Sequence, residues 1–275
     1  YILFTRKIRF RKVMKLRVRV VCILSVLLLF VSMTSCGQLP QESTQANNEP
    51  NVQVVNYGIE MKNSDYVYTI NEDGITLKKY IGTEKEITIP QTIDGYDVVS
   101  IGQDCFSDKK DILSVELSGK LKTIQSFAFY RCDKLSKLII KNGLKIIGRS
   151  AFAHCTALEA VTLPKSVTQI GECAFANCTE LKTVSFAGQR ELQIGAAAFS
   201  ETAIEKIVLP EGTTTISNAA FINCKKLKEV YLPNSVSSVK SNAFKKSPKV
   251  VLYAASGTYG ESFAKTNGIK HKTVG

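Results

Sequence analysis

The sequence of 275 residues contains no tryptophan, three methionines and only two histidines. Two histidines exclude a metal centre or a catalytic site built from several imidazoles, because such sites bring two or three of them together. The sequence also lacks a G-x-x-x-x-G-K-[ST] loop, an H-E-x-x-H helix and a G-x-S-x-G elbow, which argues against three large classes of hydrolase. We therefore predict a protein that is not an enzyme and binds no cofactor or metal.

Acidic residues are absent from the first part of the chain, and this explains most of the positive net charge. The formal net charge of +12 would by itself suggest a nucleic-acid partner. Residues 1–35, however, hold eight basic residues and no acidic one. We assign this excess to a targeting segment and expect no nucleic-acid partner. Charge is unevenly distributed along the rest of the chain. Residues 36–120 have seven basic and fourteen acidic residues, whereas residues 221–275 have ten basic and two acidic residues.

The targeting segment has the features of an export signal. From Met14 onward, three basic residues precede an almost uninterrupted apolar run at 20–31. This length fits a signal-peptide core and is shorter than the roughly 20 residues of a membrane span. The sequence MTSCG at 33–37 resembles the bacterial lipobox, in which the cysteine receives diacylglycerol and becomes the new N-terminus. We predict a lipoprotein signal peptide at 14–35 and lipidation of Cys36.

The flanking segments complete this prediction. Residues 1–13 are either an upstream extension or an unusually long basic region of the signal. Residues 36–50 are polar and rich in Gln, Asn and Pro, which is typical of a flexible tether. The chain is thus expected to be exported, lipid-anchored to a bacterial membrane and exposed at the surface. The alternative is an ordinary secretory signal in which the cysteine occurs by chance.

Phenylalanine recurs at an almost constant interval through the rest of the chain. The successive intervals are 23, 23, 23, 24, 22 and 23 residues. An isoleucine or valine stands five residues before each phenylalanine and a small residue directly before it. A fixed period of this length predicts a solenoid, in which stacked coils share one continuous core. The seven residues are Phe106, Phe129, Phe152, Phe175, Phe199, Phe221 and Phe244.

The second half of each repeat, L-x-x-V-x-L, has the alternation of a short strand, and a proline often follows it. The segments IGRSAFAHCTALEAVTLP (147–164) and IGECAFANCTELKTVSF (170–186) show the whole unit. They resemble the BspA-type leucine-rich repeat family. The resemblance extends to the entry segment EITIPQTIDGYDVVSIG (86–102) and to YGESFAKTNGIK (259–270), which looks like the closing cap of that family.

The expected fold is an α/β-poor repeat solenoid of ~23-residue coils, built mainly from short parallel strands with turns or short helices. Residues 51–86 contain alternating residues around a turn at Glu72–Gly74, which predicts an N-terminal β-hairpin cap. The solenoid is placed at 87–253 and a C-terminal helical cap at 254–275.

The repeat region contains six of the eight cysteines, four of them at the position three residues after Phe. Thr and Ser fill the same position in other coils, so we interpret these cysteines as small buried residues in the reduced form. Disulfides and a metal site are the alternatives. Parallel side chains on neighbouring coils have poor geometry for a bridge, and there is no C-x-x-C motif. The four are Cys132, Cys155, Cys178 and Cys224.

The predicted strands expose two rows of side chains on one sheet about seven strands wide. The resemblance implies that such a face binds protein, for recognition of a host or neighbouring cell. We predict this face as the ligand-binding site: the first row is Thr88, Glu116, Ile139, Thr162, Ser185, Val208 and Tyr231, and the flanking row is Lys137, Ala160, Thr183, Lys206 and Glu229.

An alternative partner is an anionic polysaccharide or envelope polymer bound by the basic C-terminal end. Glycan binding would favour an aromatic platform, and the first row offers only Tyr231 for one. The basic residues at this end are Lys225, Lys226, Lys228, Lys240, Lys245, Lys246 and Lys249.

The predicted anchor can be tested with a Cys36→Ser variant. Serine lacks the soft thiol that forms the thioether, so we expect the variant to lose acyl labelling and to be released from the membrane fraction or mislocalised. Metabolic labelling with a fatty-acid analogue, followed by fractionation, measures both. Unchanged membrane retention with an unchanged lipid label would contradict the assignment.

Overall fold

The computed structural model describes residues 58–274, which lie within a compact unit at Val54–Gly275. The predicted signal peptide, Cys36 and the tether lie outside the described residues. Among the residues that are described, no helix is long and apolar enough to cross a bilayer.

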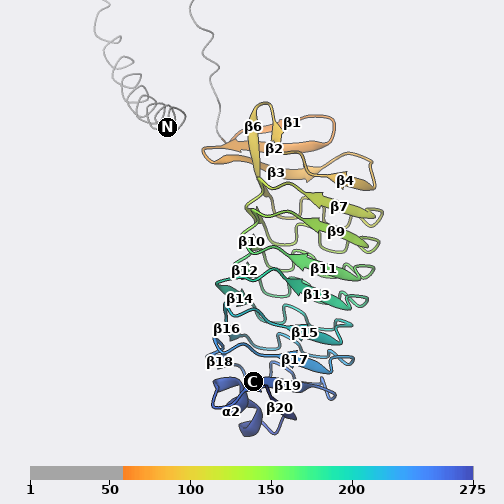
Figure 1. Ribbon diagram of the computed structural model, residues 1–275. Coiled ribbons are helices and arrows are strands. Elements are labelled where there is room, and N and C mark those ends of the chain that lie inside the picture. The colour runs from red at the N-terminus through yellow and green to blue at the C-terminus, as the bar shows by residue number, and fades with distance from the viewer. Residues whose placement is uncertain (1–57, 275) are drawn as a thin grey trace, which may run out of the picture. The chain divides into compact units, whose positions relative to one another are not determined.

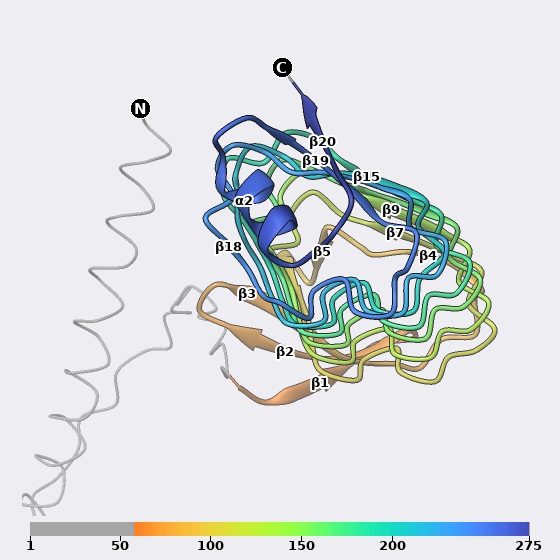
Figure 2. The ribbon, with the colours of Figure 1, turned by 90° about the horizontal axis from the view of Figure 1, so that it is seen from below.

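The described residues form a solenoid of stacked parallel coils, as the repeat predicts (Figure 1). Seen along the stack, the coils superimpose as nested loops with a β wall on each of two sides (Figure 2). We call these the front wall and the back wall. The front wall consists of β4 (Glu86–Thr88), β7 (Ser114–Leu117), β9 (Lys137–Ile140), β11 (Ala160–Leu163), β13 (Thr183–Phe186), β15 (Lys206–Val208), β17 (Glu229–Tyr231), β19 (Val251–Ala255) and β20 (His271–Val274).

The back wall is a second run of parallel strands that the sequence analysis did not predict. Most of its strands are only two to four residues long and contain the isoleucine or valine that precedes each Phe. Their register places Ile147 beside Ile124 on one side and Ile170 on the other. The strands are β6 (Tyr96–Ile101), β8 (Thr123–Ile124), β10 (Ile146–Ile147), β12 (Gln169–Ile170), β14 (Leu192–Ile194), β16 (Thr213–Ile216) and β18 (Ser238–Val239).

The seven repeat phenylalanines form one stack through the core. Neighbouring ring centroids are 4.7 to 5.6 Å apart, and the planes differ by 3 to 10°. The first six rings are fully buried, and Phe244 at the end is 6% exposed. The centroid spacing is close to the 4.7–4.9 Å between paired strands, so rings and backbone keep the same repeat.

The turn around each phenylalanine bonds to the next coil through alternate backbone N–H groups. In the coil of Phe175, the N–H groups of Cys173, Phe175 and Asn177 donate to carbonyl oxygens of the following coil at 2.8, 2.8 and 2.9 Å. Cys173 and Asn177 have φ values of 54° and 58°. The N–H groups in between bond within the coil at 3.3 and 3.0 Å, so every second N–H of the turn points to the next coil.

Glycine after the isoleucine allows this close approach. A Cβ at Gly171 would lie 2.6 Å from the carbonyl carbon of Gly148, and one at Gly195 would lie 2.6 Å from that of Gly171. Real Cβ atoms do not come so close to backbone, so a side chain here would push the coils apart.

The cysteines are free thiols, as interpreted from the sequence. The structure adds a role for the four that stand three residues after a repeat phenylalanine: each of these thiols donates a hydrogen bond to the carbonyl oxygen of the phenylalanine one coil earlier. Cys155 Sγ lies 3.3 Å from the oxygen of Phe129, and Ser247 Oγ makes the equivalent bond at 2.7 Å to Phe221. From the second coil onward this position holds a small side chain that carries a polar hydrogen.

The N-terminal cap continues the core beyond the first coil. β2 (Tyr66–Asn71) and β3 (Gly74–Tyr80) form the predicted hairpin, and β3 pairs in parallel with β6. The ring of Tyr80 stacks on Phe106 at 5.1 Å, so it covers the first phenylalanine. Two further strands were not predicted, β1 (Glu60–Lys62) beside β2 and β5 (Thr92–Ile93) beside β6.

The C-terminal cap contains the predicted helix and one unexpected strand. Helix α2 (Tyr259–Thr266) begins after Thr258, whose hydroxyl accepts a hydrogen bond from the N–H of Glu261. Phe263 and Ala264 are buried against the last coil. The chain then forms β20, which pairs in parallel with β19 and extends the front wall.

The buried thiols predict how stability depends on pH. Burial raises the pKa of Cys132 and Cys178 to about 12 and that of Cys155 well above its usual value. Above pH 9 the unfolded chain loses thiol protons that the folded chain keeps, so the free energy of unfolding falls as the pH rises. Each thiol lowers the free energy of unfolding by up to about 1.4 kcal/mol for each pH unit between pH 9 and 11.

A variant with Cys132→Ser, Cys155→Ser and Cys178→Ser is the matched comparison, because serine fills this position at Ser247. Urea unfolding measures the free energy of unfolding of both proteins from pH 8 to 11. Plotted against pH, the two free energies should converge, since only the wild type loses the contribution of these three thiols. Parallel curves would show that the thiols ionise equally in both states.

Candidate ligand-binding face

The strand register of the front wall places the residues of the first predicted row side by side on neighbouring strands. Glu116 pairs with Ile139, Thr162 with Ser185, and Val208 with Tyr231. Residues of this row are exposed or half-buried, while the strand residues beside them point into the core. Ile139 is 38% exposed and Val208 54% exposed. The two apolar side chains therefore contact solvent on a face that no other element in the described part of the chain covers.

The flanking row lies beside the first and is also accessible. Lys137 pairs with Ser114, Ala160 with Thr183, and Lys206 with Glu229. Thr88, at the start of the first row, pairs with Glu116. All the residues predicted for the two rows therefore lie on one wall.

The backbone ladder of the front wall is not continuous. It is divided into β4–β7–β9, β11–β13 and β15–β17–β19–β20. At the first interruption, between β9 and β11, the face has a hollow of about 480 Å³. Ile139, Ile140, Ala160 and Thr162 are among the residues that line it. The hollow is mainly apolar, so it can accept an apolar side chain of a partner.

The other end of the face carries an aromatic cluster. The rings of Tyr231 and Tyr253 stack with their centroids 4.3 Å apart and their planes at 14°. Lys206 Nζ lies 4.7 Å from the centroid of Tyr231, and Lys272 Nζ lies 5.6 Å from that of Tyr253. The strand order β15–β17–β19–β20 places the four side chains in the sequence lysine, tyrosine, tyrosine, lysine. Such cation–π contacts hold the rings in place.

Tyr253 and Lys272 were missed by the sequence analysis, which found one aromatic residue in this row. The repeat of 23 residues places Ala254 opposite Tyr231, but the strands pair Tyr231 with Tyr253. One residue fewer separates β17 and β19, and this turns Tyr253 outward. No alternation in the sequence around β19 marks the change.

The cluster differs from an aromatic platform for sugars. Each tyrosine ring has the other tyrosine on one face and a lysine on the opposite side, so neither face is free for a flat sugar ring. The ring edges and hydroxyl groups remain accessible. Glu229 Oε2 lies 3.3 Å from Lys206 Nζ and 3.4 Å from the hydroxyl of Tyr231, which balances part of the positive charge. This geometry suits contacts with protein side chains better than stacking on a glycan.

Most lysines of the basic end do not form a compact patch on the front wall. Lys228 pairs with Glu205 at 2.8 Å, whereas Lys245 lines a separate notch between the last coil and the cap. Lys245 therefore lies outside the two predicted rows, whereas Lys228 lies next to the flanking row.

The described residues contain no group of three or more ligating side chains that could hold a metal. Burial raises the pKa of the repeat thiols, and raised pKa values disfavour the thiolate that a nucleophile requires.

Comparison with known proteins agrees with this architecture. A family model described as "BspA type Leucine rich repeat region" matches residues 80–191 and 192–258 in six copies. No curated protein matches the sequence. The crystal structure of a leucine-rich repeat protein from T. pallidum has 22% identity and a TM-score of 0.52, with 78% of this chain and 98% of that chain covered. This likeness shows the solenoid fold.

Two further crystal structures are more distant in shape. A leucine-rich cell surface protein of Faecalibacterium prausnitzii has 23% identity and a TM-score of 0.41 over 72% of this chain and 76% of that chain. A pneumococcal vaccine antigen has 14% identity and a TM-score of 0.45 over 80% of this chain and 99% of that chain.

Proposed function

The chain belongs to the BspA-type leucine-rich repeat family, and from this premise we propose that it is a lipid-anchored bacterial surface protein that binds other proteins. The partner is a protein of a host or a neighbouring cell, and the outcome is adhesion or recognition. The ligand contacts the two rows on the front wall. Leucine-rich repeats are in general non-enzymatic binding scaffolds, which supports a role in recognition.

The observation that carries the proposal is the uncovered apolar surface of the front wall. Ile139 and Val208 remain exposed although each lies beside buried strand residues. Apolar groups in water at the centre of a face, with polar residues around them, are typical of a protein contact surface. The hollow between β9 and β11 adds a place where a partner's side chain can be buried.

The aromatic cluster supplies a second contact point. Tyr231 and Tyr253 are already fixed by stacking and by their lysine neighbours. Because these rings lose little freedom when a partner binds, most of the contact energy is retained as affinity. Tyrosine is common among the residues that dominate interface energies.

Lipid attachment at Cys36 fits this mode of action. Residues 36–50 have the composition of a flexible tether, which would hold the binding domain away from the bilayer. Several acyl chains give stable membrane attachment, because each buried methylene group contributes about 0.8 kcal/mol.

The proposal predicts that a variant with Ile139→Glu and Tyr231→Ala loses ligand capture. A charge at the apolar hollow and the loss of one ring should weaken binding by about 2 kcal/mol or more, which is roughly 30-fold. Both side chains point outward, so thermal unfolding should change little. Pull-down from host matrix and bacterial envelope extracts identifies the ligand, and titration of the captured protein measures its affinity.

A matched control is Ile59→Glu with Tyr130→Ala, which makes the same chemical changes away from the front wall. Ile59 is 55% exposed on the N-terminal cap, and Tyr130 lies on the turn side of its coil. This variant should capture the ligand like the wild type. Equal binding by the front-wall variant and the wild type would exclude the proposed face.

A further inference from the structure

The last coil of the solenoid leaves backbone donors without an acceptor. In the earlier coils, the N–H of each repeat phenylalanine from Phe106 to Phe221 donates to a carbonyl oxygen of the next coil at 2.7 to 2.9 Å. The equivalent N–H groups of Phe244 and Lys246 have no hydrogen-bond partner among the described residues. Lys246 has a φ of 61°, like its counterpart Asn223 at 59°. The terminal turn therefore repeats the backbone conformation of the earlier turns, but no further coil among the described residues accepts these two N–H groups.

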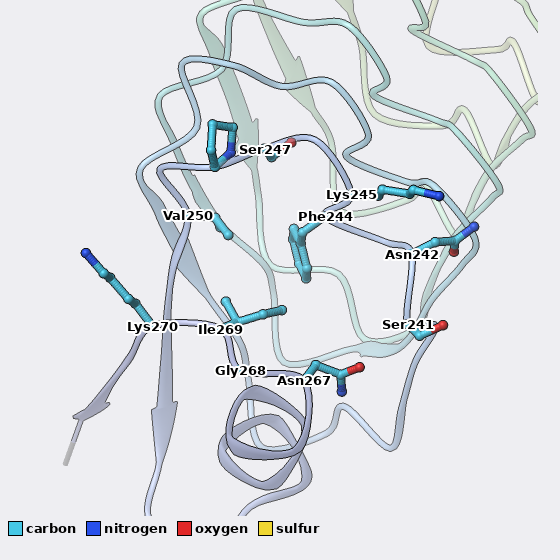
Figure 3. Close-up of a pocket in the computed structure, with 11 residues that line it drawn as sticks. Ser241, Asn242, Phe244, Lys245, Ser247, Val250, Asn267, Gly268, Ile269 and Lys270 are labelled. Atoms are coloured by element: carbon cyan, nitrogen blue, oxygen red, sulfur yellow. The ribbon is translucent and has the colours of Figure 1, made fainter.

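A notch of about 560 Å³ lies at this end of the solenoid, between the last coil and the loop that follows α2 (Figure 3). Phe244 and Ile269 face the same space from opposite sides, and Val250 lies beside them (Figure 3). Phe244 is the last ring of the stack and has a ring neighbour on only one side among the described residues. The notch thus combines an apolar floor with unused backbone donors.

The border of the notch is basic. Lys245 and Lys270 line it, Lys246 and Lys249 are close in sequence, and none of the lining residues is acidic. Glu261 is the acidic residue of the C-terminal cap, and it is paired with Lys265 at 2.9 Å and with the N–H of Gly257. A ligand with carboxylates therefore meets uncompensated positive charge at this end.

We propose that the notch binds an acidic peptide segment in a turn conformation. Two of its carbonyl oxygens accept hydrogen bonds from the N–H groups of Phe244 and Lys246, and one apolar side chain contacts Phe244, Val250 and Ile269. Carboxylates on either side of that residue pair with Lys245 and Lys270. The peptide occupies the place that the turn of another coil would take.

The spacing of the donors favours a peptide over an anionic glycan. In each earlier coil, the acceptors for these N–H groups are carbonyl oxygens of alternate residues, as with Ala198 and Ser200 for Phe175 and Asn177. A polypeptide in the same turn conformation presents carbonyl oxygens of alternate residues toward one side. A sulfated glycan would satisfy the lysines but has no regular row of carbonyl acceptors for the two donors.

The test uses the full chain and a fluorescein-labelled heptapeptide with a central leucine between three glutamates on each side. Fluorescence anisotropy should show saturable binding, weakened at least tenfold by Lys245→Glu with Lys270→Glu. Ile269→Glu should have a similar effect, because its carboxylate competes for the same donors. Hydrogen–deuterium exchange should show that the peptide slows exchange at Phe244 and Lys246 in the wild type.

The matched control is Lys225→Glu with Lys226→Glu, an equal charge change in the preceding coil, where the next coil fills the turn. This control should bind the peptide like the wild type, and so should the front-wall variant, which separates this site from the proposed function. Equal losses in the two lysine variants would overturn the proposal by showing diffuse charge attraction. It would also be overturned if a sulfated hexasaccharide bound at least as tightly, if the two amides gained no protection, or if sedimentation showed a dimer of the chain that the Lys245→Glu with Lys270→Glu variant no longer formed.

Discussion

Stacking of the repeat phenylalanines is the interaction on which the rest of the structure depends. The rings lie at nearly the same separation as hydrogen-bonded strands, so ring contact and backbone pairing reinforce each other in every coil. At Gly148, Gly171 and Gly195 a Cβ would collide with the preceding coil, so glycine fits the close approach there, whereas Ser217 and Lys240 fill the equivalent positions later in the stack. The thiol of Cys155 and the turn around Phe175 also bond to neighbouring coils.

This arrangement leaves the outer faces free to vary. Each coil is stabilised by its neighbours through buried groups, so the outward residues on the front wall carry little of the folding energy. The exposed Ile139 and the Tyr231–Tyr253 pair can therefore serve recognition without weakening the solenoid. In the last coil, the N–H groups of Phe244 and Lys246 repeat the pattern but have no acceptor among the described residues.

Much of the fold follows from the sequence because the period is visible in residue types. The spacing of the phenylalanines predicts the solenoid, and the alternation in L-x-x-V-x-L predicts which side chains of β11 and β17 point outward. The back wall was missed because strands such as β8, with two residues, are too short to show alternation. Tyr253 was missed because the spacing shortens by one residue before β19, and only the register of the strands reveals it. The sequence also contains no signal for the hollow at Ile139, which arises where the ladder between β9 and β11 is interrupted.

The most direct test of this account is the free energy of unfolding of a Phe152→Ala variant, measured with urea together with hydrogen exchange. Phe152 is fully buried between Phe129 and Phe175, at 5.1 and 5.3 Å. The account predicts a loss of about 3–5 kcal/mol and faster exchange in both neighbouring coils, whereas Phe127→Ala, at the half-buried turn, should cost much less. A loss in the Phe152 variant no larger than in the Phe127 variant, with faster exchange confined to its own coil, would contradict the central role of the stack.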